Sequence, residues 1–362
     1  MKALILVGGY GTRLRPLTLT KPKPLVEFAN KPIIRHQIEA LVSTGVTEIV
    51  LALSYQAEAM KNYMKVLSEE LKVKITFTYE TQPLGTAGPL ALARDILWEK
   101  DTDPNTPMFM LNSDVICEFP LKEMLEFHKN HKKQGTILVT QVQDPSKYGV
   151  IVHEDSGKIQ KFVEKPKIFV GNEINAGIYI LNINTIDRIQ LKPTSIEREV
   201  FPLMAKEEEL FCFPLKKFWM DMGQPADYIR GLELYLNFAQ PPKPEKYQNV
   251  DIVGNVVIDD SVEIGDGSVI GPNVSVDKNV KIGKGVRLAN CAVFSGSVID
   301  NSSFLSSSLI GWNCHIGSWT RLENGCVLGD DVTVKNEVFM NNVIVLPNKV
   351  ISESIPQPKI IL

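Results

Sequence analysis

Two different hydrophobic periods divide this chain. Up to about residue 236, short continuous apolar runs alternate with segments whose apolar positions recur at helical spacing, and residues 3–7, 49–53 and 108–111 are the clearest runs. Continuous apolar runs of this length are typical of parallel strands that are buried on both faces. Strands that alternate with helices predict an α/β domain, in which helices cover both faces of a mostly parallel sheet.

The same pattern predicts where further helices and strands lie. We expect one helix to begin at Asn30, Lys31 and Pro32, with the asparagine as its cap and the proline in its first turn, and to stop at Gly45. His128 and His131 share a face of another helical segment without a third metal ligand, so we expect them to be surface residues. The other predicted helices are 57–71 and 87–98, and the other strands are 73–79, 136–142, 150–152, 159–163 and 177–181.

A six-residue period replaces this alternation in the last third of the chain. From residue 252 to 294, and again from 298 to 346, every sixth residue is apolar. This period is typical of hexapeptide-repeat β-helices, in which each hexapeptide forms one side of a triangular coil. The step from Phe294 to Val298 is four residues, so we expect a shortened side or a disturbed corner there. Gly265, Gly271 and Gly283 follow apolar positions and are expected at corners.

The two patterns define the predicted domains. Residues 1–236 form the α/β domain, residues 237–250 a linker rich in proline and charge, and residues 251–362 the β-helix. A short β-helix has open ends with apolar edges, which repeat proteins cover with caps or partners. We therefore expect a homo-oligomer whose copies contact each other through residues 251–362.

Composition narrows the range of partners and compartments. A net charge of −3 argues against a general nucleic-acid binder. No apolar stretch is long enough for a membrane span, and the five-residue run before Gly8 is too short for a signal-peptide core. The 5 cysteines are scattered without a Cys-x-x-Cys pair, which indicates reduced thiols. We expect a cytoplasmic protein that binds neither nucleic acid nor membrane.

Residues 6–25 carry the first chemical signal. The apolar strand stops at Gly8 and Gly9, and Gly11 follows before Thr12 and Arg13. A buried strand that breaks into glycines brings backbone N–H groups against phosphate oxygens, and the cationic side chains nearby add charge for a polyphosphate. No Walker-type string occurs, and Leu14 and Pro16 rule out a dinucleotide-binding fingerprint.

Two aspartates are candidate metal ligands. Asp114 follows the strand 108–111, at the sheet edge where the glycine loop also lies, and Asp221 belongs to the string Trp-Met-Asp-Met-Gly. Two carboxylates can hold one Mg²⁺ while phosphate oxygens and water complete its octahedron. The spacing alone leaves open whether these two side chains meet, and an aspartate in a turn is more often a cap.

The motifs together resemble a known family. Gly-Gly-x-Gly-Thr-Arg-Leu-x-Pro from Gly8, followed by Pro-Lys-Pro from Pro22, resembles the signature of the sugar-1-phosphate nucleotidylyltransferases. Over the whole chain the resemblance is to the GDP-mannose pyrophosphorylases of the eukaryotic catalytic, or β, type. It implies a Rossmann-like nucleotidyltransferase domain followed by a left-handed parallel β-helix of hexapeptide repeats.

The resemblance also implies roles for individual residues. Asp114 and Asp221 would share the Mg²⁺, and Arg13, Lys23 and Lys165 would be catalytic. The implied nucleotide-binding residues are Leu6, Gly8, Gly9, Gly11, Thr12, Arg13, Lys23, Gly85, Thr86 and Asn112, and the implied sugar-binding residues are Tyr148, Gly149, Glu164, Lys165 and Asn175.

The implied reaction converts GTP and mannose 1-phosphate into GDP-mannose and pyrophosphate, which would supply GDP-mannose for glycosylation. The sugar phosphate is already an anionic nucleophile, so positioning and charge neutralisation suffice. Two alternatives stay open. One is a nucleotidylyltransferase for another sugar 1-phosphate, such as glucose 1-phosphate. The other is a non-catalytic regulatory subunit, and a regulatory α-type paralogue is in turn an expected partner of a catalytic chain.

Overall fold

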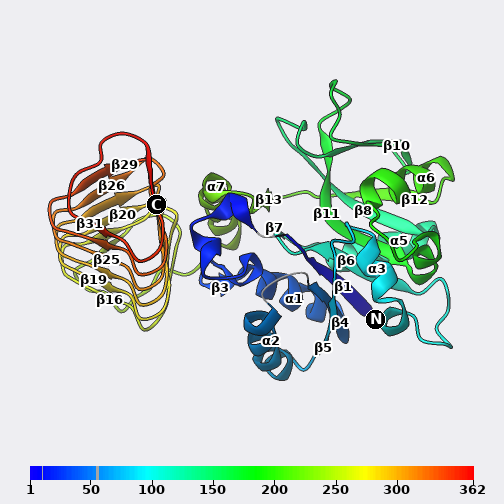
Figure 1. Ribbon diagram of the computed structural model, residues 1–362, viewed down its shortest axis with the longest axis horizontal. Helices are drawn as coiled ribbons and strands as arrows, with labels where there is room; N and C mark the ends of the chain where they lie inside the picture. Colours follow the sequence, from blue (N-terminus) through cyan, green and yellow to red (C-terminus); the bar gives the residue numbers. More distant parts are fainter. Residues whose placement is uncertain (10, 54–56) are drawn as a thin grey trace. The chain divides into compact units, whose positions relative to one another are not determined.

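The computed structural model describes residues 1–9, 11–53 and 57–362 and consists of two compact units (Figure 1). Unit 1 comprises Met1–Gly9 and Ile34–Trp219, and unit 2 comprises Tyr10–Ile33 and Met220–Leu362. Tyr10, which belongs to the glycine-loop motif, lies outside the described residues. Both units are built from elements that are far apart in the sequence, so each is described by itself.

Unit 1 is organised around a mixed sheet whose centre is parallel. β1 lies between β6 and β4 and runs parallel to both, and β5 extends the parallel part beyond β4. β11 is antiparallel to β6 and joins β8, β9 and β10 to the sheet. The predicted α/β architecture is confirmed. The strands of this sheet are β1 Lys2–Val7, β4 Glu48–Leu53, β5 Lys74–Tyr79, β6 Pro107–Asn112, β8 Gly135–Gln141, β9 Gly149–His153, β10 Ile159–Glu164, β11 Glu173–Asn182 and β12 Leu210–Pro214, and β7 Val115–Cys117 lies outside it.

Helices connect these strands and bury their apolar sides against the sheet. The predicted helix 87–98 is divided, because Ala93 has a ψ of 4° and interrupts the helical hydrogen bonding between α3 and α4. The helices are α1 Ile33–Ser43, α2 Ala57–Leu71, α3 Gly88–Leu92, α4 Arg94–Leu97, α5 Leu121–His131 and α6 Phe201–Lys206, with a 3₁₀ segment at Ile183–Arg188 and a π-helical turn at Ile196–Val200. No described helix has the length and apolarity that crossing a bilayer requires.

The two histidines of α5 are not surface residues, contrary to the expectation. His128 is 3% exposed and its ring nitrogens lie 2.8 Å from Thr136 Oγ1 and 2.9 Å from Asn182 Oδ1. His131 stacks on Phe211 with ring centroids 4.4 Å apart. The sequence shows only that both side chains share a helix face, whereas the edge of β8 and β11 covers that face.

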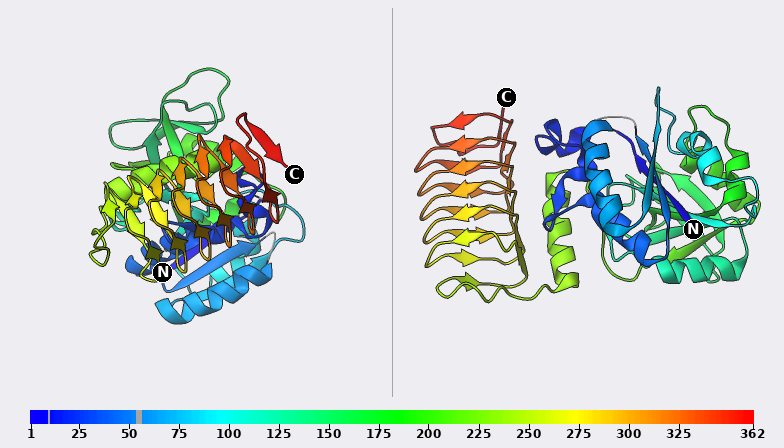
Figure 2. Two further views of the ribbon diagram at one scale, coloured as in Figure 1. Left: turned by 90° about the vertical axis from the view of Figure 1, so that its left-hand side faces the viewer. Right: turned by 90° about the horizontal axis from the view of Figure 1, so that it is seen from below.

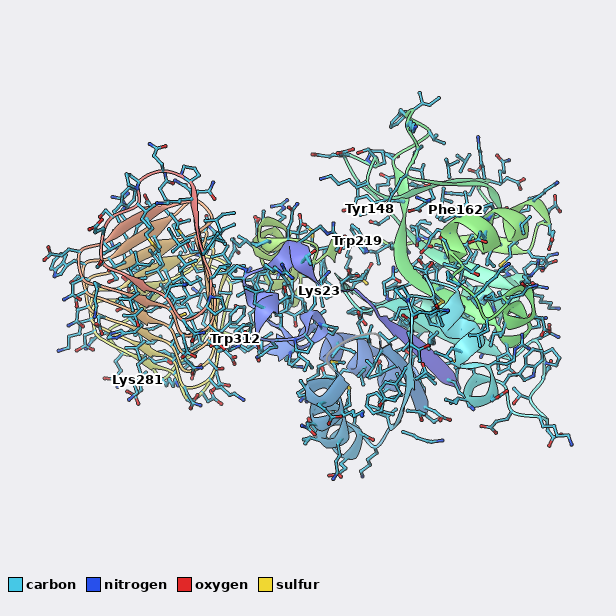
Figure 3. The ribbon with its side chains drawn as sticks, viewed as in Figure 1. Lys23, Tyr148, Phe162, Trp219, Lys281 and Trp312 are labelled. Atoms are coloured by element: carbon cyan, nitrogen blue, oxygen red, sulfur yellow. The ribbon has the colours of Figure 1, made fainter. Side chains whose placement is uncertain are left out.

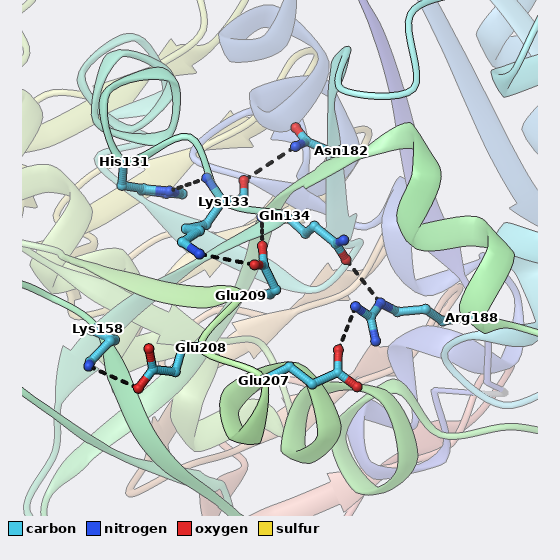
Figure 4. Close-up of polar contacts among 9 residues, drawn as sticks. All are labelled: His131, Lys133, Gln134, Lys158, Asn182, Arg188, Glu207, Glu208 and Glu209. Atoms are coloured by element: carbon cyan, nitrogen blue, oxygen red, sulfur yellow. Dashed lines mark hydrogen bonds and ion pairs between the residues drawn. The ribbon is translucent and has the colours of Figure 1, made fainter.

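Ion pairs tie the segments around this edge together (Figure 4). Lys133 Nζ lies 3.0 Å from Glu209 Oε1, and Arg188 Nη2 lies 2.7 Å from Glu207 Oε2. The contacts join α5 and the 3₁₀ segment to the chain that leads into β12. They lie outside the candidate site.

Unit 2 contains a three-faced parallel β-helix, seen as stacked coils in Figure 2. Each face is a ladder of short parallel strands, which confirms the predicted hexapeptide repeat and is consistent with the left-handed coil that the resemblance implies. One face consists of β14 Asp251–Ile252, β17 Val269–Ile270, β20 Arg287–Ala289, β23 Phe304–Ser306, β26 Arg321–Glu323 and β29 Phe339–Asn341; the second of β15 Val256–Ile258, β18 Val274–Val276, β21 Ala292–Val293, β24 Leu309–Ile310, β27 Val327–Leu328, β30 Val343–Val345 and β32 Lys359–Ile361; the third of β16 Glu263–Ile264, β19 Lys281–Ile282, β22 Val298–Ile299, β25 His315–Ile316, β28 Thr333–Val334 and β31 Val350–Ile351.

The predicted reading frame of the repeat is wrong between residues 294 and 304, and again at its end, where Val345 rather than Leu346 pairs with Leu328 and enters the core. The ladder pairs Leu288 with Leu305 and Val293 with Ile310, and Ile299 points into the same buried core. The inward residues are therefore separated by five, six, six and five positions, so that two sides are one residue short and the four-residue step does not exist. Phe294 is buried, but it is not part of the β-helix core cluster.

Glycines at the predicted corners are explained by close approach of neighbouring coils. A Cβ on Gly265 would lie 2.6 Å from the Lys284 nitrogen, and one on Gly283 would lie 2.7 Å from the Asn301 nitrogen. Such distances leave no room for a side chain, so these positions need glycine for space. Of the three glycines, only Gly271 also has a positive φ, of 112°.

The remainder of unit 2 comes from two other parts of the chain. Asn30 is not a helix cap: it has a φ of 65° in the turn of a small hairpin, and its Nδ2 donates to the Val276 carbonyl at 2.7 Å. Helix α1 therefore begins only at Ile33. The remaining elements are β2 Glu27–Phe28, β3 Lys31–Pro32, β13 Trp219–Asp221 and α7 Pro225–Ala239, with 3₁₀ turns at Thr12–Leu14, Leu17–Leu19 and Lys23–Leu25.

Candidate active site

The carboxyl ends of β1 and β6 bring the first predicted residues together in unit 1. Leu6 on β1 is in register with Asn112 on β6, and the Ser113 N–H donates to the Leu6 carbonyl at 3.2 Å. Gly8 and Gly9 follow β1 at the same edge, and Asp114 follows Ser113. The structure thus places the start of the glycine loop and the turn that carries Asp114 at one end of the parallel sheet, as the pattern predicts.

Gln37 holds the turn that carries Asp114, and it was missed by the sequence analysis. Its side chain is fully buried on α1, and its Nε2 donates to the carbonyls of Asn112 (2.8 Å) and Val115 (2.9 Å). These two carbonyls flank Ser113 and Asp114. A glutamine among helical residues is ordinarily read as solvated, and the sequence contains no sign that its amide is used in this way.

β11 supplies a second wall next to Asn112. Gly177 has a φ of 78°, and a Cβ on it would lie 2.8 Å from Asn112 Nδ2. Asn175 Nδ2 donates to the Tyr179 hydroxyl at 2.8 Å, and Asn175 Oδ1 accepts from the Gly177 N–H at 2.9 Å. The missing side chain of Gly177 lets the two asparagine-bearing strands approach closely, so that both amides have defined orientations.

The predicted sugar contacts Glu164 and Lys165 end β10. Burial and the neighbouring Glu197 raise the pKa of the Glu164 carboxyl, which Lys165 Nζ approaches to 3.5 Å. A Cβ on Gly149 would lie 2.8 Å from Glu164 Oε2, so any larger residue here would collide with the carboxylate in its present position. The Lys165 N–H donates to the Tyr148 carbonyl at 3.0 Å. Four of the five predicted sugar residues therefore meet at the pairing of β9 and β10.

The aromatic ring of Tyr148 lies edge-on against Trp219, with centroids 5.5 Å apart (Figure 3). Trp219 Nε1 in turn donates to the Ala176 carbonyl at 2.9 Å, between Asn175 and Gly177. Trp219 thus connects the β9 side of the predicted sugar region with β11.

The predicted base loop around Gly85 and Thr86 contacts residues 194–197, which the sequence patterns did not single out. Gly85 has a φ of 72°, and a Cβ there would lie 2.4 Å from the Thr194 carbonyl oxygen. Thr86 Oγ1 donates to Glu197 Oε2 at 2.6 Å and accepts from the Ile196 N–H at 2.9 Å. The Thr86 hydroxyl is therefore engaged within the protein. The charge of Glu197 also raises the pKa of the Glu164 carboxyl, so Glu197 interacts with both this loop and Glu164.

Unit 2 contains the predicted cations of the glycine loop. Gly11 has a φ of 59°, and a Cβ on it would lie 3.2 Å from the Cβ of Lys23. Thr18 Oγ1 donates to the Gly11 carbonyl at 2.7 Å and closes the same turn. Arg13 lies in the 3₁₀ turn Thr12–Leu14, and Gly11 is the N-cap residue of this turn. The segment is thus a series of tight turns that holds Arg13 and Lys23 on one short stretch.

The second metal candidate, Asp221, lies next to Arg13 within unit 2. A Cβ on Gly223 would lie 3.5 Å from both Asp221 Oδ2 and Arg13 Nη1, and 3.1 Å from Asp227 Oδ2. Gly223 therefore leaves an open space beside a guanidinium and two carboxylates. Oxygen donors of this kind suit a hard cation such as Mg²⁺. No described residues form a cluster of three or more histidine, cysteine or acidic side chains that could hold a metal ion.

Comparison with known proteins identifies the family. The nucleotidyl transferase family matches residues 2–237, and the GMPPB C-terminal domain family matches residues 252–361. Curated relatives match over the entire chain: the mannose-1-phosphate guanylyltransferase catalytic subunit beta of Xenopus tropicalis and the mannose-1-phosphate guanylyltransferase 1 of Arabidopsis thaliana are each 54% identical, with 100% of both chains covered. The chain belongs to the mannose-1-phosphate guanylyltransferase family. This family consists of nucleotidyltransferases, which generally use a divalent metal.

Solved structures agree with the fold of about two thirds of the chain. The structure of HddC from Yersinia pseudotuberculosis complexed with GMP-PN is 28% identical, with a TM-score of 0.52, and the match covers 65% of this chain and 99% of that one. A putative glucose-1-phosphate thymidylyltransferase from Bacillus anthracis has a TM-score of 0.58 at 24% identity, covering 68% of this chain and 98% of that one. The second likeness concerns the fold alone.

Proposed function

We propose that this protein transfers a guanylyl group from GTP to mannose 1-phosphate, forming GDP-mannose and releasing pyrophosphate. The observation that carries the proposal is the 54% identity over the full length to mannose-1-phosphate guanylyltransferase catalytic subunits. Every position implied by the family motifs is occupied by the required residue type, including Arg13, Lys23, Asp114, Lys165 and Asp221. A non-catalytic subunit would not need all of these charges, and no observation favours a different sugar phosphate.

The proposed roles divide between the two units. Arg13 and Lys23 of unit 2, with the backbone of Gly11 and Thr12, bind the triphosphate and the departing pyrophosphate. Gly8 and Gly9 of unit 1 leave backbone N–H groups accessible at the carboxyl end of β1. The remaining nucleotide-binding residues, which we assign to the base and ribose, are Leu6, Gly85, Thr86 and Asn112.

The sugar phosphate is assigned to the β9–β10 region of unit 1. Glu164 and Asn175 accept and donate hydrogen bonds to sugar hydroxyls, and Tyr148 with Gly149 shapes the space for the ring. Lys165 is 57% exposed at its side chain, so its ammonium can reach a phosphate while it stays within 3.5 Å of Glu164. We infer that it neutralises and orients the attacking phosphate.

The chemistry follows from this arrangement without a general base. An oxygen of the mannose 1-phosphate forms a bond to the α-phosphorus of GTP, and the bond from that phosphorus to the bridging oxygen of the β-phosphate breaks in line with it. The leaving group is pyrophosphate. Because the nucleophile is already ionised, the side chains need only align it and stabilise charge. Asp114 and Asp221 would hold a Mg²⁺, which neutralises phosphate charge when bound.

We further propose the assembly and setting of the protein. Residues 1–236 form the catalytic domain, 237–250 the linker and 251–362 an oligomerisation domain, and a regulatory α-type paralogue can join the homo-oligomer. The compartment is the cytoplasm, which suits five buried free cysteines. If the subunit number measured by light scattering were the same for the chain truncated after residue 236, the β-helix would not be the oligomer contact.

The test of the activity uses purified protein with Mg²⁺ and a panel of nucleoside triphosphates and sugar 1-phosphates. We expect pyrophosphate release to be fastest with GTP and mannose 1-phosphate. A faster reaction with glucose 1-phosphate would favour the other nucleotidylyltransferases, and absence of any turnover despite correct folding would favour a regulatory subunit.

The site assignment is tested by Lys165→Ala, with the exposed neighbour Lys167→Ala as a matched control. Loss of the ammonium should raise the KM for mannose 1-phosphate about 10- to 100-fold, while the KM for GTP stays within about twofold. The control should behave like the unmodified protein. Full activity of Lys165→Ala would refute its role on the sugar phosphate.

A further inference from the structure

One outer side of the β-helix carries two aromatic residues that are buried without belonging to the β-helix core. Phe294 is 2% exposed and Trp312 is 5% exposed, and their rings stack with centroids 4.7 Å apart and planes 12° from parallel. By contrast, Trp319, seven residues further along the same β-helix, is 69% exposed. Because Phe294 and Trp312 point away from the core of the coil, other parts of unit 2 must cover them.

The cover is the segment that carries the proposed triphosphate cations. Lys21 Nζ lies 4.1 Å from the centroid of the Trp312 ring, and Trp312 Nε1 donates to Glu27 Oε2 at 3.0 Å. Lys21 also donates to both carboxylate oxygens of Glu27, at 2.8 and 3.0 Å. The three side chains close a ring of interactions in which each contacts the other two. All three are largely shielded from water, which strengthens charge-assisted hydrogen bonds and cation–π contacts.

Further contacts fix the hairpin of β2 and β3 to the same surface. Asn30 Nδ2 donates to the Val276 carbonyl at 2.7 Å, and the Tyr228 hydroxyl on α7 donates to the Glu27 carbonyl at 2.6 Å. Tyr228 lies edge-on against Phe294, with centroids 6.0 Å apart. Glu27 is therefore held through its side chain by Trp312 of the β-helix and through its backbone by Tyr228, against which the β-helix residue Phe294 packs.

Short-range geometry connects this attachment to the cations. Lys23 begins a 3₁₀ turn only two residues after Lys21, and the Val26 N–H donates to the Lys23 carbonyl at 3.1 Å. The Lys23 stem packs against Gly11, where even a Cβ would come within 3.2 Å. A displacement of Lys21 would therefore move Lys23 and the turn before Arg13 together. Displacements of about 1 Å at a reacting group can cost on the order of 100-fold in rate.

We propose that Trp312 is a positioning residue for the nucleotide: it holds Lys21 and Glu27, and through them sets the place of Lys23 and Arg13. The β-helix is thus a working part of the triphosphate site as well as a domain for assembly. The inference rests on the proposed function, because it presupposes that Lys23 and Arg13 bind the triphosphate of GTP.

The experiment compares Trp312→Leu with the matched control Trp319→Leu in the full-length protein. In Trp312→Leu we expect the KM for GTP, and the KM for pyrophosphate in the reverse reaction, to rise about 10-fold, with the KM for mannose 1-phosphate within about twofold. A purely structural role would reduce the amount of active enzyme, and hence the apparent kcat, without this selective change in KM. Trp319→Leu should leave all three KM values unchanged.

Two conservative variants keep the proposal falsifiable if Trp312→Leu does not fold. Trp312→Phe retains an aromatic ring but removes the N–H donor and part of the ring area, and Glu27→Gln retains the shape and removes the charge that pairs with Lys21. Each should raise the KM for GTP about threefold or more while circular dichroism stays unchanged. A folded Trp312→Leu, or a folded pair of conservative variants, with unchanged KM for GTP and pyrophosphate would overturn the inference. If the unmodified protein itself does not use GTP and mannose 1-phosphate, the proposed function fails instead.

Discussion

Trp312 and Glu27 are hydrogen-bonded at 3.0 Å although 285 positions separate them in the sequence. The bond joins the β-helix to the turn-rich segment that follows the glycine loop. Together with the Lys21 contacts, it makes residues from the two ends of the chain one structural body. This relationship explains why the segment 11–33 belongs to unit 2, although the strand before it lies in the sheet of unit 1.

Removing either proposed metal carboxylate should abolish most of the activity. Asp114→Asn and Asp221→Asn keep the side-chain shape and remove the charge, so we expect kcat/KM to fall about 10²- to 10³-fold and the Mg²⁺ concentration for half-maximal rate to rise. Steady-state rates over a Mg²⁺ titration measure both effects. The exposed Asp103→Asn is the control and should titrate like the unmodified protein. If the two site variants keep their Mg²⁺ dependence, the metal lies elsewhere.

Gln37 should matter for catalysis although it touches no proposed substrate atom. Gln37→Leu fits the buried position but leaves the carbonyls of Asn112 and Val115 without their donor, which should cost about 1–3 kcal/mol in the free energy of unfolding. Because these carbonyls flank Asp114, kcat should also fall about 10-fold or more.

Gln134→Leu provides the comparison for this prediction. It removes a glutamine that accepts from Arg188 Nε at 2.9 Å, in the cluster of Figure 4 outside the candidate site. It should lower stability without lowering kcat. Equal effects of both variants on kcat would mean that Gln37 does not position the Asp114 turn.

Ionisation of Asp277 should destabilise the protein as the pH rises from about 4 to about 6. Burial, with Glu27 nearby, raises the pKa of its carboxyl to about 6 despite the partly compensating Lys278, and Asp259 and the Tyr228 hydroxyl are the other ionisable groups that act with it. A carboxyl with a raised pKa contributes its full stabilisation below its ordinary pKa, near 3.8. This contribution is lost as the pH rises to about 6, the pKa of Asp277 in the folded protein. Asp277→Asn cannot ionise, so it should be about 2 kcal/mol more stable at pH 8 and equal at pH 4.

Urea unfolding at the two pH values measures this difference. Because the Asp277 carboxyl lies on the surface that receives the segment 11–33, the same variant also reports on the attachment of that segment. A stability gain that is the same at pH 4 and pH 8 would contradict the ionisation argument.

His131 should have the opposite pH dependence. Burial and the adjacent His128, with a further contribution from Lys133, lower its pKa to about 4. A lowered histidine pKa gives stability that is present above the ordinary value of 6.5 and is lost as the pH falls towards 4. Since the ring is only partly buried, we expect His131→Gln to reduce the acid-side loss between pH 6.5 and 4 by about 1–2 kcal/mol.

Thermal unfolding at half-unit pH steps tests this expectation. His153→Gln is the matched control, because a hydrogen bond to the Glu154 carbonyl and the Glu173 carboxylate, 2.6 Å from the ring, raise the pKa of His153 despite its partial burial. The two variants should change the pH profile in opposite directions. Parallel changes would show that burial does not control the His131 pKa.

Local patterns predicted most of the elements. Continuous apolar runs predicted β1, β4 and β6, because a strand buried on both faces leaves no place for polar side chains. The six-residue period predicted the β-helix, since each side of a coil contributes one inward residue to the core. Motif order then indicated the family, which the comparisons confirmed. The roles of individual site residues remain predictions.

Two of the errors share one physical cause. The frame of the repeat was wrong because Phe294 is apolar and buried, but against Tyr228 and Trp312 rather than inside the coil. Asn30 resembled a helix cap, whereas its amide binds the distant Val276 carbonyl. In each case a local signal was correct about the burial or polarity of a residue and silent about its partner.

The sequence by itself thus determined most of the strands and helices, the repeat, and the family, because periodicity and motif spacing are properties of neighbouring residues. Only the tertiary structure decided that Gln37 hydrogen-bonds to the turn that carries Asp114, that Glu197 interacts with both the Thr86 loop and Glu164, and that Trp312 hydrogen-bonds to Glu27. These relationships depend on pairs separated by tens to hundreds of positions, whose contact is fixed when the sheet and the coil pack.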